Sequence, residues 1–268
     1  YCYRCPEGKE YPACGVSCLA ALDEALREEG DAAAAVILEP LLLGAGGMIV
    51  YPPEYLSGAA RLARGHGVHL ILDEVATGFG RTGTMFACEQ AGVSPDFLCL
   101  SKGLTSGTMP LAATLTTPEV YNAFLGDPDG GKTFFHGHTY TANPVGCAAA
   151  LASLDLFGEE GVVERVAALA PRLAEGARAL GGLPLVGDVR HIGLVAALEL
   201  VRDKETREPL PGTDRVFREV RREGLRRGLF LRPLGNVVYL FLPQAVTRPD
   251  LDDILDRFGE TLRATLRG

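Results

Sequence analysis

Two charged residues, Asp73 and Lys102, have types and positions that could do chemistry. Each follows a short apolar run, Val68–Leu72 in one case and Phe97–Leu100 in the other. Such runs are typical of buried parallel strands, and ligands of open α/β sheets bind beyond the carboxyl ends of these strands. An amine buried there can form a Schiff base with an aldehyde, and a carboxylate can hold the proton of a pyridine nitrogen. The alternative is a solvated acid and a loop lysine that never meet.

The residues around the pair favour the chemical interpretation. They are Asp73-Glu74-Val75-Ala76-Thr77-Gly78-Phe79-Gly80-Arg81-Thr82-Gly83, followed by Pro95-Asp96 and Ser101-Lys102-Gly103. These stretches resemble the signature of class III aminotransferases, which are fold-type-I enzymes that use pyridoxal 5'-phosphate. The resemblance implies an enzyme that transfers an amino group between a small-molecule amino donor and a keto acceptor.

Three further stretches extend the resemblance over the rest of the chain, and they are most similar to family members of biotin synthesis. They are Met85–Glu89, Thr133–Tyr140 with Asn143-Pro144, and Leu231–Gly235. Within the family, the alternative is a general ω-aminotransferase for ornithine, 4-aminobutyrate, β-alanine or lysine. Outside it, the alternative is a catalytically incompetent fragment of such an enzyme.

The elements that must position these residues follow from the hydrophobic pattern. Apolar runs predict strands at 35–38, 68–72, 97–100, 111–115, 186–189, 194–200 and 237–242. Helical spacing predicts helices over 14–29, 52–64, 118–124, 143–157, 162–180, 214–227 and 249–266. The alternation indicates an α/β protein. With the resemblance it predicts the pyridoxal-phosphate transferase fold type I, in which 1–160 form a partial large cofactor-binding domain with a mostly parallel sheet. Residues 161–268 then form a C-terminal α+β small domain.

The resemblance implies roles for the residues at the predicted strand ends. Lys102 would be the catalytic residue that binds the cofactor aldehyde and then moves a proton at the substrate carbon. Asp73 would hold the proton of the ring nitrogen through a charge-assisted hydrogen bond. Val75 lies two residues further on and would pack against the ring face. Arg81 is expected to be structural and to hold the glycine-rich turn.

Other site residues come from the two later stretches. By resemblance, Thr139 would donate its hydroxyl to the cofactor phosphate of the neighbouring subunit, and His138 would lie in the same cofactor-side loop. Gly137 would border the substrate. Arg232 would grip the substrate carboxylate as a guanidinium fork, with Tyr239 nearby. The alternatives are an ordinary loop threonine and a surface arginine paired with an acid.

Composition narrows the classes of partner. Hydrophobic residues make up 47% of the 268 residues, charged residues make up 22%, and the net charge is −8. An acidic surface argues against nucleic acid and anionic membrane as partners. No apolar run is long enough to span a bilayer. We expect a cytoplasmic protein, and the shared phosphate contact implies a homodimer with shared active sites.

Seven cysteines invite a metal hypothesis, because Cys2, Cys5, Cys14 and Cys18 form two closely spaced pairs. The spacer of eight residues lacks a hairpin pattern, however, so we predict no metal site and reduced thiols. His66, His69 and His191 have no partner pattern and are expected to be solvated or packed.

The first residues, Tyr1-Cys2-Tyr3-Arg4-Cys5-Pro6, resemble the interior of the family's large domain. We therefore expect the phosphate-binding loop and the stacking aromatic residue to be absent from the sequence. The 268 residues alone are expected to be poorly active for this reason.

Overall fold

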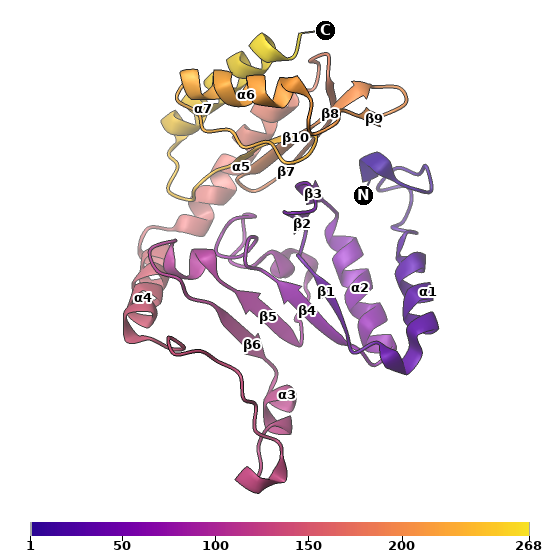
Figure 1. Cartoon of the computed structure of the whole chain (residues 1–268), viewed down its shortest axis with the longest axis vertical. Helices are drawn as coiled ribbons and strands as arrows, with labels where there is room; N and C mark the ends of the chain where they lie inside the picture. The colour runs from indigo at the N-terminus through magenta and orange to yellow at the C-terminus, as the bar shows by residue number, and fades with distance from the viewer. Residues whose placement is uncertain (1, 268) are drawn as a thin grey trace.

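The computed structural model describes residues 2–267 and holds two main sheets, one above the other in Figure 1. The first sheet has the strand order β1-β4-β5-β6 and the second has the order β10-β8-β7, with β9 paired to β8. A two-stranded ribbon, β2-β3, lies between them (Figure 1). The chain therefore forms two layered bodies of mixed α and β structure.

The first sheet is mostly parallel, as the pattern predicts. Its strands are β1 (Ala35–Leu38), β4 (His69–Asp73), β5 (Phe97–Leu100) and β6 (Ala113–Thr116). Strands β1, β4 and β5 are parallel, whereas β6 is antiparallel to β5. One face packs its buried leucines on helix α2 (Pro53–Gly65), and α1 (Leu19–Glu29) packs outside α2. The opposite face leaves Ile37 62% exposed, because no helix of the described chain covers it.

The second sheet is antiparallel and has helices on one face. Its strands are β7 (Val186–Ile192), β8 (Val195–Asp203), β9 (Glu208–Pro209) and β10 (Val237–Phe241). The covering helices are α5 (Val162–Arg178), α6 (Arg215–Arg226) and α7 (Arg248–Thr265). Alternate residues of β8, such as Leu198 and Leu200, enter this core because successive side chains of a strand point to opposite faces.

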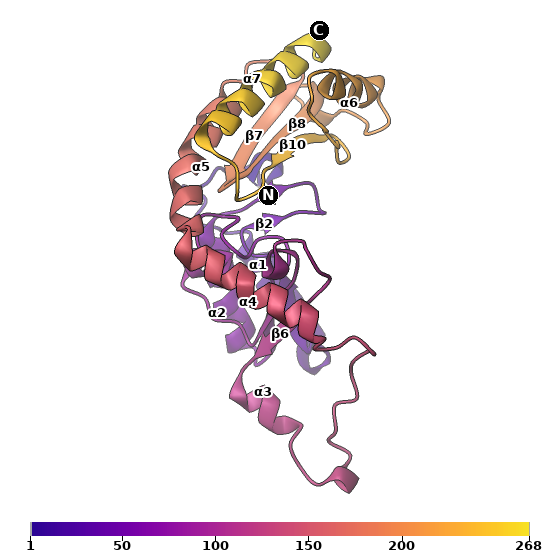
Figure 2. The ribbon, with the colours of Figure 1, turned by 90° about the vertical axis from the view of Figure 1, so that its left-hand side faces the viewer.

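The other face of the second sheet contacts the first body. Val195, Ala197 and Val237 form a cluster with Leu42 and Met48 of the ribbon that contains β2 (Leu42–Leu43) and β3 (Ile49–Val50). Helix α4 (Pro144–Glu159) leads into α5 and runs along the side of the first sheet (Figure 2). These contacts set the position of the second sheet above the carboxyl ends of β4 and β5.

A long arm leaves the first sheet after β6. It contains α3 (Pro118–Ala123) and the segment 124–143, which extends away from both bodies in Figures 1 and 2. Phe134, Phe135 and Tyr140 are 64%, 93% and 74% exposed on this arm. The arm therefore presents aromatic surface that the rest of the described chain does not cover.

One predicted boundary is wrong. The sequence pattern places a helix from Cys14, but α1 begins at Leu19 and the preceding residues form turns. Gly15 and Val16 have φ angles of 56° and 58°, which are left-handed values that an α-helix cannot continue through. The other predicted helices and strands are present with shifts of a few residues at their ends.

Candidate active site

Lys102 lies just beyond the end of β5. It opens the short 3-10 helix η4 (Lys102–Thr105) with a φ of 44°, a left-handed value that a residue with a side chain rarely adopts. Its carbonyl accepts the amide N–H of Gly107 at 3.2 Å. A strained conformation of this kind costs about 1–3 kcal/mol and persists where the surroundings enforce it. Such strain is typical of functional sites.

Asp73 is the last residue of β4, the neighbouring parallel strand. It is in register with Cys99 of β5, three residues before Lys102. Its Oδ1 accepts the amide N–H of Val75 at 3.0 Å. The structure therefore brings the carboxylate and the amine to one edge of one sheet, where ligands of α/β proteins bind. Burial differs from the expectation: Asp73 is half-buried and Lys102 is exposed, because the described chain leaves this end of the sheet open.

Lys102 borders a cavity of about 540 Å³ between the two bodies. Val75 and Arg81 line it from the first body, and Phe241 and Gln244 line it from the second. Asp73 does not line this cavity. Lys102 thus borders a space whose walls come from sequence segments more than a hundred residues apart.

Arg81 connects the glycine-rich turn to the second sheet. Its guanidinium donates to the carbonyl of Leu242 and, at 3.0 Å, to Oε1 of Gln244, and it stacks 4.3 Å from the ring centre of Phe241. Burial lowers the pKa of Arg81 to about 10. This matches the expected structural role, but the partners lie in the other body and were not predictable from the turn itself.

Glu74 is a buried acid to which the sequence patterns gave no role. Its carboxylate accepts the hydroxyl of Thr77 at 2.6 Å and the amide N–H of Cys88 at 2.8 Å. Burial raises the pKa of Glu74, while these hydrogen bonds lower it in part. The sequence did hold a signal for its burial. Glu74 lies two residues after Leu72, and alternate residues of a strand point to the same face, so Glu74 is on the face that packs on α2.

Arg232 and Tyr239 line a second cavity of about 330 Å³ on the second body. Phe241 borders both this cavity and the one at Lys102, so the two spaces are neighbours. Arg232 itself is exposed and Tyr239 is half-buried. The structure therefore brings two of the three predicted substrate-binding residues together and places them next to the lysine cavity.

Gly137, His138 and Thr139 lie on the exposed arm. The amide N–H of His138 donates to Oγ1 of Thr141 at 2.9 Å, and the imidazole accepts from the amide of Tyr140 at 3.1 Å. None of the three lines the cavity at Lys102. Within one chain, this loop is therefore not part of the site.

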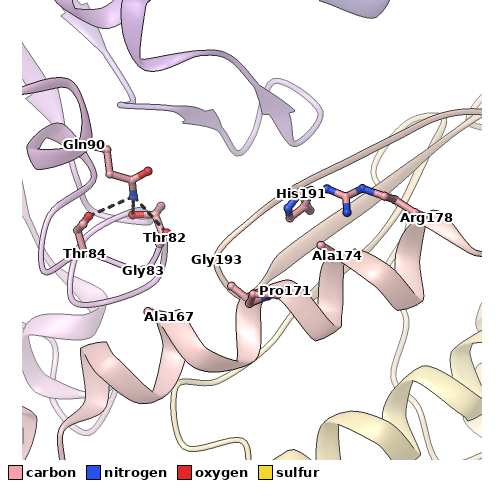
Figure 3. Close-up of a pocket in the computed structure, with 11 residues that line it drawn as sticks. Thr82, Gly83, Thr84, Gln90, Ala167, Pro171, Ala174, Arg178, His191 and Gly193 are labelled. Atoms are coloured by element: carbon pink, nitrogen blue, oxygen red, sulfur yellow. Dashed lines mark hydrogen bonds between the residues drawn. The ribbon is translucent and has the colours of Figure 1, made fainter.

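A third cavity, of about 440 Å³, lies between the glycine-rich turn and α5 (Figure 3). On one side Gln90 donates to the hydroxyls of Thr82 and Thr84 at 3.1 and 3.2 Å. On the other side lie Arg178 and His191 (Figure 3), and the pKa of His191 is lowered by burial and by the charge of Arg178. The predicted site residues do not line this groove, and His191 is partly packed, as expected.

The four cysteines of the metal hypothesis all lie before α1. Cys2 is exposed, Cys5, Cys14 and Cys18 are half-buried, and all are free thiols. Burial raises the pKa of the Cys2 and Cys18 thiols. Across residues 2–267, no three His, Cys, Asp or Glu side chains are grouped as a metal site would require. No helix in the same range has both the length and the apolar character of a membrane span.

The residues at the sheet edge fit a pyridoxal phosphate ring. An amine beside a cavity, a carboxylate on the adjacent strand and a branched apolar side chain two residues further are the donor set that an aldehyde and a pyridinium require. Phe241 and Gln244 of the second body line the same cavity from the opposite side.

Comparison with known proteins agrees with this site. The family model described as Aminotransferase class-III matches residues 3–262. The chain therefore belongs to the class III aminotransferases.

Individual relatives refine the family assignment. The adenosylmethionine-8-amino-7-oxononanoate aminotransferase of Geobacter sulfurreducens is 48% identical over the whole chain, which covers 59% of that relative. A crystal structure of the enzyme of that name from Methanocaldococcus jannaschii superposes with a TM-score of 0.89 at 41% identity, covering 95% of this chain and 59% of that chain. The structure of an amine transaminase from an uncultivated Pseudomonas species, in its PLP-bound form, superposes with a TM-score of 0.91 at 35% identity, covering 99% of this chain and 60% of that chain. The chain thus spans 59% of the length of the Geobacter relative.

Proposed function

We propose that this protein is a pyridoxal-phosphate-dependent aminotransferase. The observation that carries the proposal is the placement of Asp73 and Lys102 at the ends of adjacent parallel strands, at an edge where the amine borders a cavity. The family assignment supports the same chemistry. When bound, pyridoxal phosphate supplies an electron sink for the negative charge that develops at the substrate carbon.

The residues of this chain would divide the work between them. The Nζ amine of Lys102 would bind the cofactor aldehyde and, once released, would carry a proton to and from the substrate carbon. The carboxylate of Asp73 would keep the ring nitrogen protonated, and the Val75 side chain would pack against the ring face. Arg232, with Tyr239 beside it, would bind the substrate carboxylate in the neighbouring cavity.

We further propose the substrates of the biotin pathway. S-adenosylmethionine would donate the amino group and 8-amino-7-oxononanoate would accept it to give 7,8-diaminononanoate. Support comes from relatives with that name at 48% and 41% identity. Solved amine transaminases at 35% and 34% identity have equally close folds, so a broader ω-amine specificity is the alternative. A panel of donors and acceptors separates the two: strong turnover of 4-aminobutyrate with no 7,8-diaminononanoate would reject the biotin proposal.

The exposed arm supports a shared site in a homodimer. Thr139, His138 and Gly137 do not line the lysine cavity of their own chain, so they would serve the site of a second copy. Thr139 would then donate to the phosphate and Gly137 would border the substrate. We also propose that 1–160 and 161–268 form the large and small domains, which agrees with their separate cores, and that the protein acts in the cytoplasm.

The test of the proposed function is spectroscopic. We expect protein incubated with pyridoxal phosphate to gain a visible absorbance that Lys102→Ala lacks, because the substitution removes the amine. Lys132→Ala, which removes an amine from the exposed arm, is the matched control and should keep the absorbance. A spectrum of Lys102→Ala identical to that of the parent would reject the proposal.

A further inference from the structure

Gln244 lies in the loop between β10 and α7, outside every motif considered above. Its carboxamide makes two contacts with the first body. Oε1 accepts from the Arg81 guanidinium at 3.0 Å, and Nε2 donates to the main-chain carbonyl of Phe79 at 2.9 Å. One planar group thus supplies an acceptor and a donor to the same turn, a combination that an amide side chain offers and a carboxylate does not.

The backbone of Phe79 has a strained conformation. It has a φ of 56°, so its backbone is in the left-handed region although it has a large side chain. The side chain is almost fully buried, and its ring lies 5.6 Å from that of Phe86 and 6.2 Å from that of Phe157. The hydrogen bond from Gln244 fixes the carbonyl of this strained residue from the side of the second sheet.

The Phe79 side chain in turn packs against the residue that follows Lys102. A Cβ atom added to Gly103 would lie 2.7 Å from Cβ and 2.8 Å from Cδ2 of Phe79, which is closer than carbon atoms pack. The chain at Gly103 is therefore fitted directly onto Phe79. Lys102, which precedes Gly103, also has a left-handed φ, so this contact lies directly beside a second strained residue.

The main chain of Gln244 is also contacted by a residue of the second body. Nη2 of Arg165 in α5 lies 3.4 Å from the Gln244 carbonyl, and Arg165 borders the same cavity as Lys102. The second body thus fixes the main chain of Gln244 while its side chain fixes the turn. This chain of contacts runs from α5 through Gln244 and Phe79 to Gly103 and Lys102.

We propose that Gln244 is a positioning residue that sets the conformation of the lysine turn, residues 102–107, from the second sheet. The consequence for catalysis rests on the function proposed for Lys102, whereas the effect on the conformation of the turn does not. The hydrogen bonds of the turn at Lys102 would persist because Gln244 keeps Phe79 packed against Gly103. Small movements of the second sheet would then change the orientation of the Lys102 side chain.

Hydrogen exchange tests this without cofactor. Leu104 donates its amide N–H to the Ser101 carbonyl, and Gly107 donates to the Lys102 carbonyl, so both amides report on the turn. We expect Gln244→Met to speed exchange at these two amides about tenfold, because it removes two hydrogen bonds of which one is to a charged group. Gln90→Met removes the chain's other glutamine, whose bonds stay within the first body, and should leave both amides unchanged.

A second variant covers the case in which Gln244→Met fails to fold. Gln244→Glu keeps an acceptor for Arg81 but loses the donor to Phe79, so exchange should rise at the same amides by a smaller factor. With cofactor present, the pH midpoint of the visible absorbance should shift in Gln244→Met and stay fixed in Gln90→Met. Unchanged exchange at Leu104 and Gly107 in both Gln244 variants would overturn the proposal, whether or not the parent binds cofactor.

Discussion

The contact between Gly103 and Phe79 makes the sharpest prediction for a single methyl group. In Gly103→Ala the new Cβ would lie 2.7 to 3.0 Å from three atoms of Phe79, whereas carbon atoms pack at about 3.5–4.0 Å. Phe79 is 2% exposed and is enclosed by Phe86 and Phe157, so it cannot move away freely. The strain must therefore be shared by the turn that holds Lys102.

The expected cost follows from overpacking. Extra carbon in a close-packed core costs about 1–3 kcal/mol, and Gly103 has no left-handed φ that would add a backbone term. We expect urea unfolding to show the free energy of unfolding of Gly103→Ala lowered by about 2 kcal/mol. With pyridoxal phosphate present, the pH midpoint of the visible absorbance should also shift in this variant, because Lys102 is the neighbouring residue.

A control and a rescue separate this clash from a general effect of removing glycine. Gly158 of α4 has no atom within 4 Å of an added Cβ, so Gly158→Ala should stabilise the protein by up to about 1 kcal/mol. Phe79→Gly removes the Cβ, Cγ and Cδ2 atoms of this clash, so combined with Gly103→Ala it should lose less free energy of unfolding than the two single variants lose in sum. A Gly103→Ala variant within 0.5 kcal/mol of the parent, a limit of roughly the size of a neutral surface change, would refute the reasoning.

Three further predictions concern the turn and a helix end. Glu74→Gln should flatten the pH dependence of stability: burial raises the Glu74 pKa, so the parent loses stability as pH rises through that pKa, and urea unfolding at pH 5 and pH 8 measures the difference. Arg81→Met leaves the Leu242 carbonyl without its charged donor and should lower the free energy of unfolding by about 2–4 kcal/mol; a loss below about 1 kcal/mol would show that the contact between the bodies is weak. The Thr247 hydroxyl caps α7 by accepting the amide N–H of Asp250 at 3.3 Å, so Thr247→Ala should lower the free energy of unfolding by about 1 kcal/mol in thermal unfolding, and Thr247→Ser should keep the parent stability.

The local elements were largely predictable because the hydrophobic period that defines them is a property of the sequence. The apolar runs at Val68–Leu72 and Phe97–Leu100 form β4 and β5, with β4 displaced by one residue to His69–Asp73 and β5 ending as expected. Parallel pairing then places Asp73 and Lys102 at one edge without further information. The start of α1 was misplaced because helical spacing does not reveal a left-handed residue such as Val16.

The partners across the two bodies were not predictable in the same way. Arg81 and Gln244 are 163 residues apart, and a polar loop residue has no periodic signal that would connect it to the glycine-rich turn. The antiparallel pairing of β6 with β5 also depends on where the chain returns, which apolar content does not specify. Long-range contacts of this kind are decided by shape and hydrogen bonding together.

The sequence by itself predicted the class of chemistry, because an acid and an amine follow two apolar runs within long and specific motifs. Only the tertiary structure decided how the lysine is held. The second sheet lies above the strand ends, Gln244 fixes the strained Phe79, and the Phe79 side chain leaves space for a glycine alone after Lys102. The physical reason is that motifs record which groups are present, whereas the conformation of the turn depends on close contacts between segments that meet only in the folded chain.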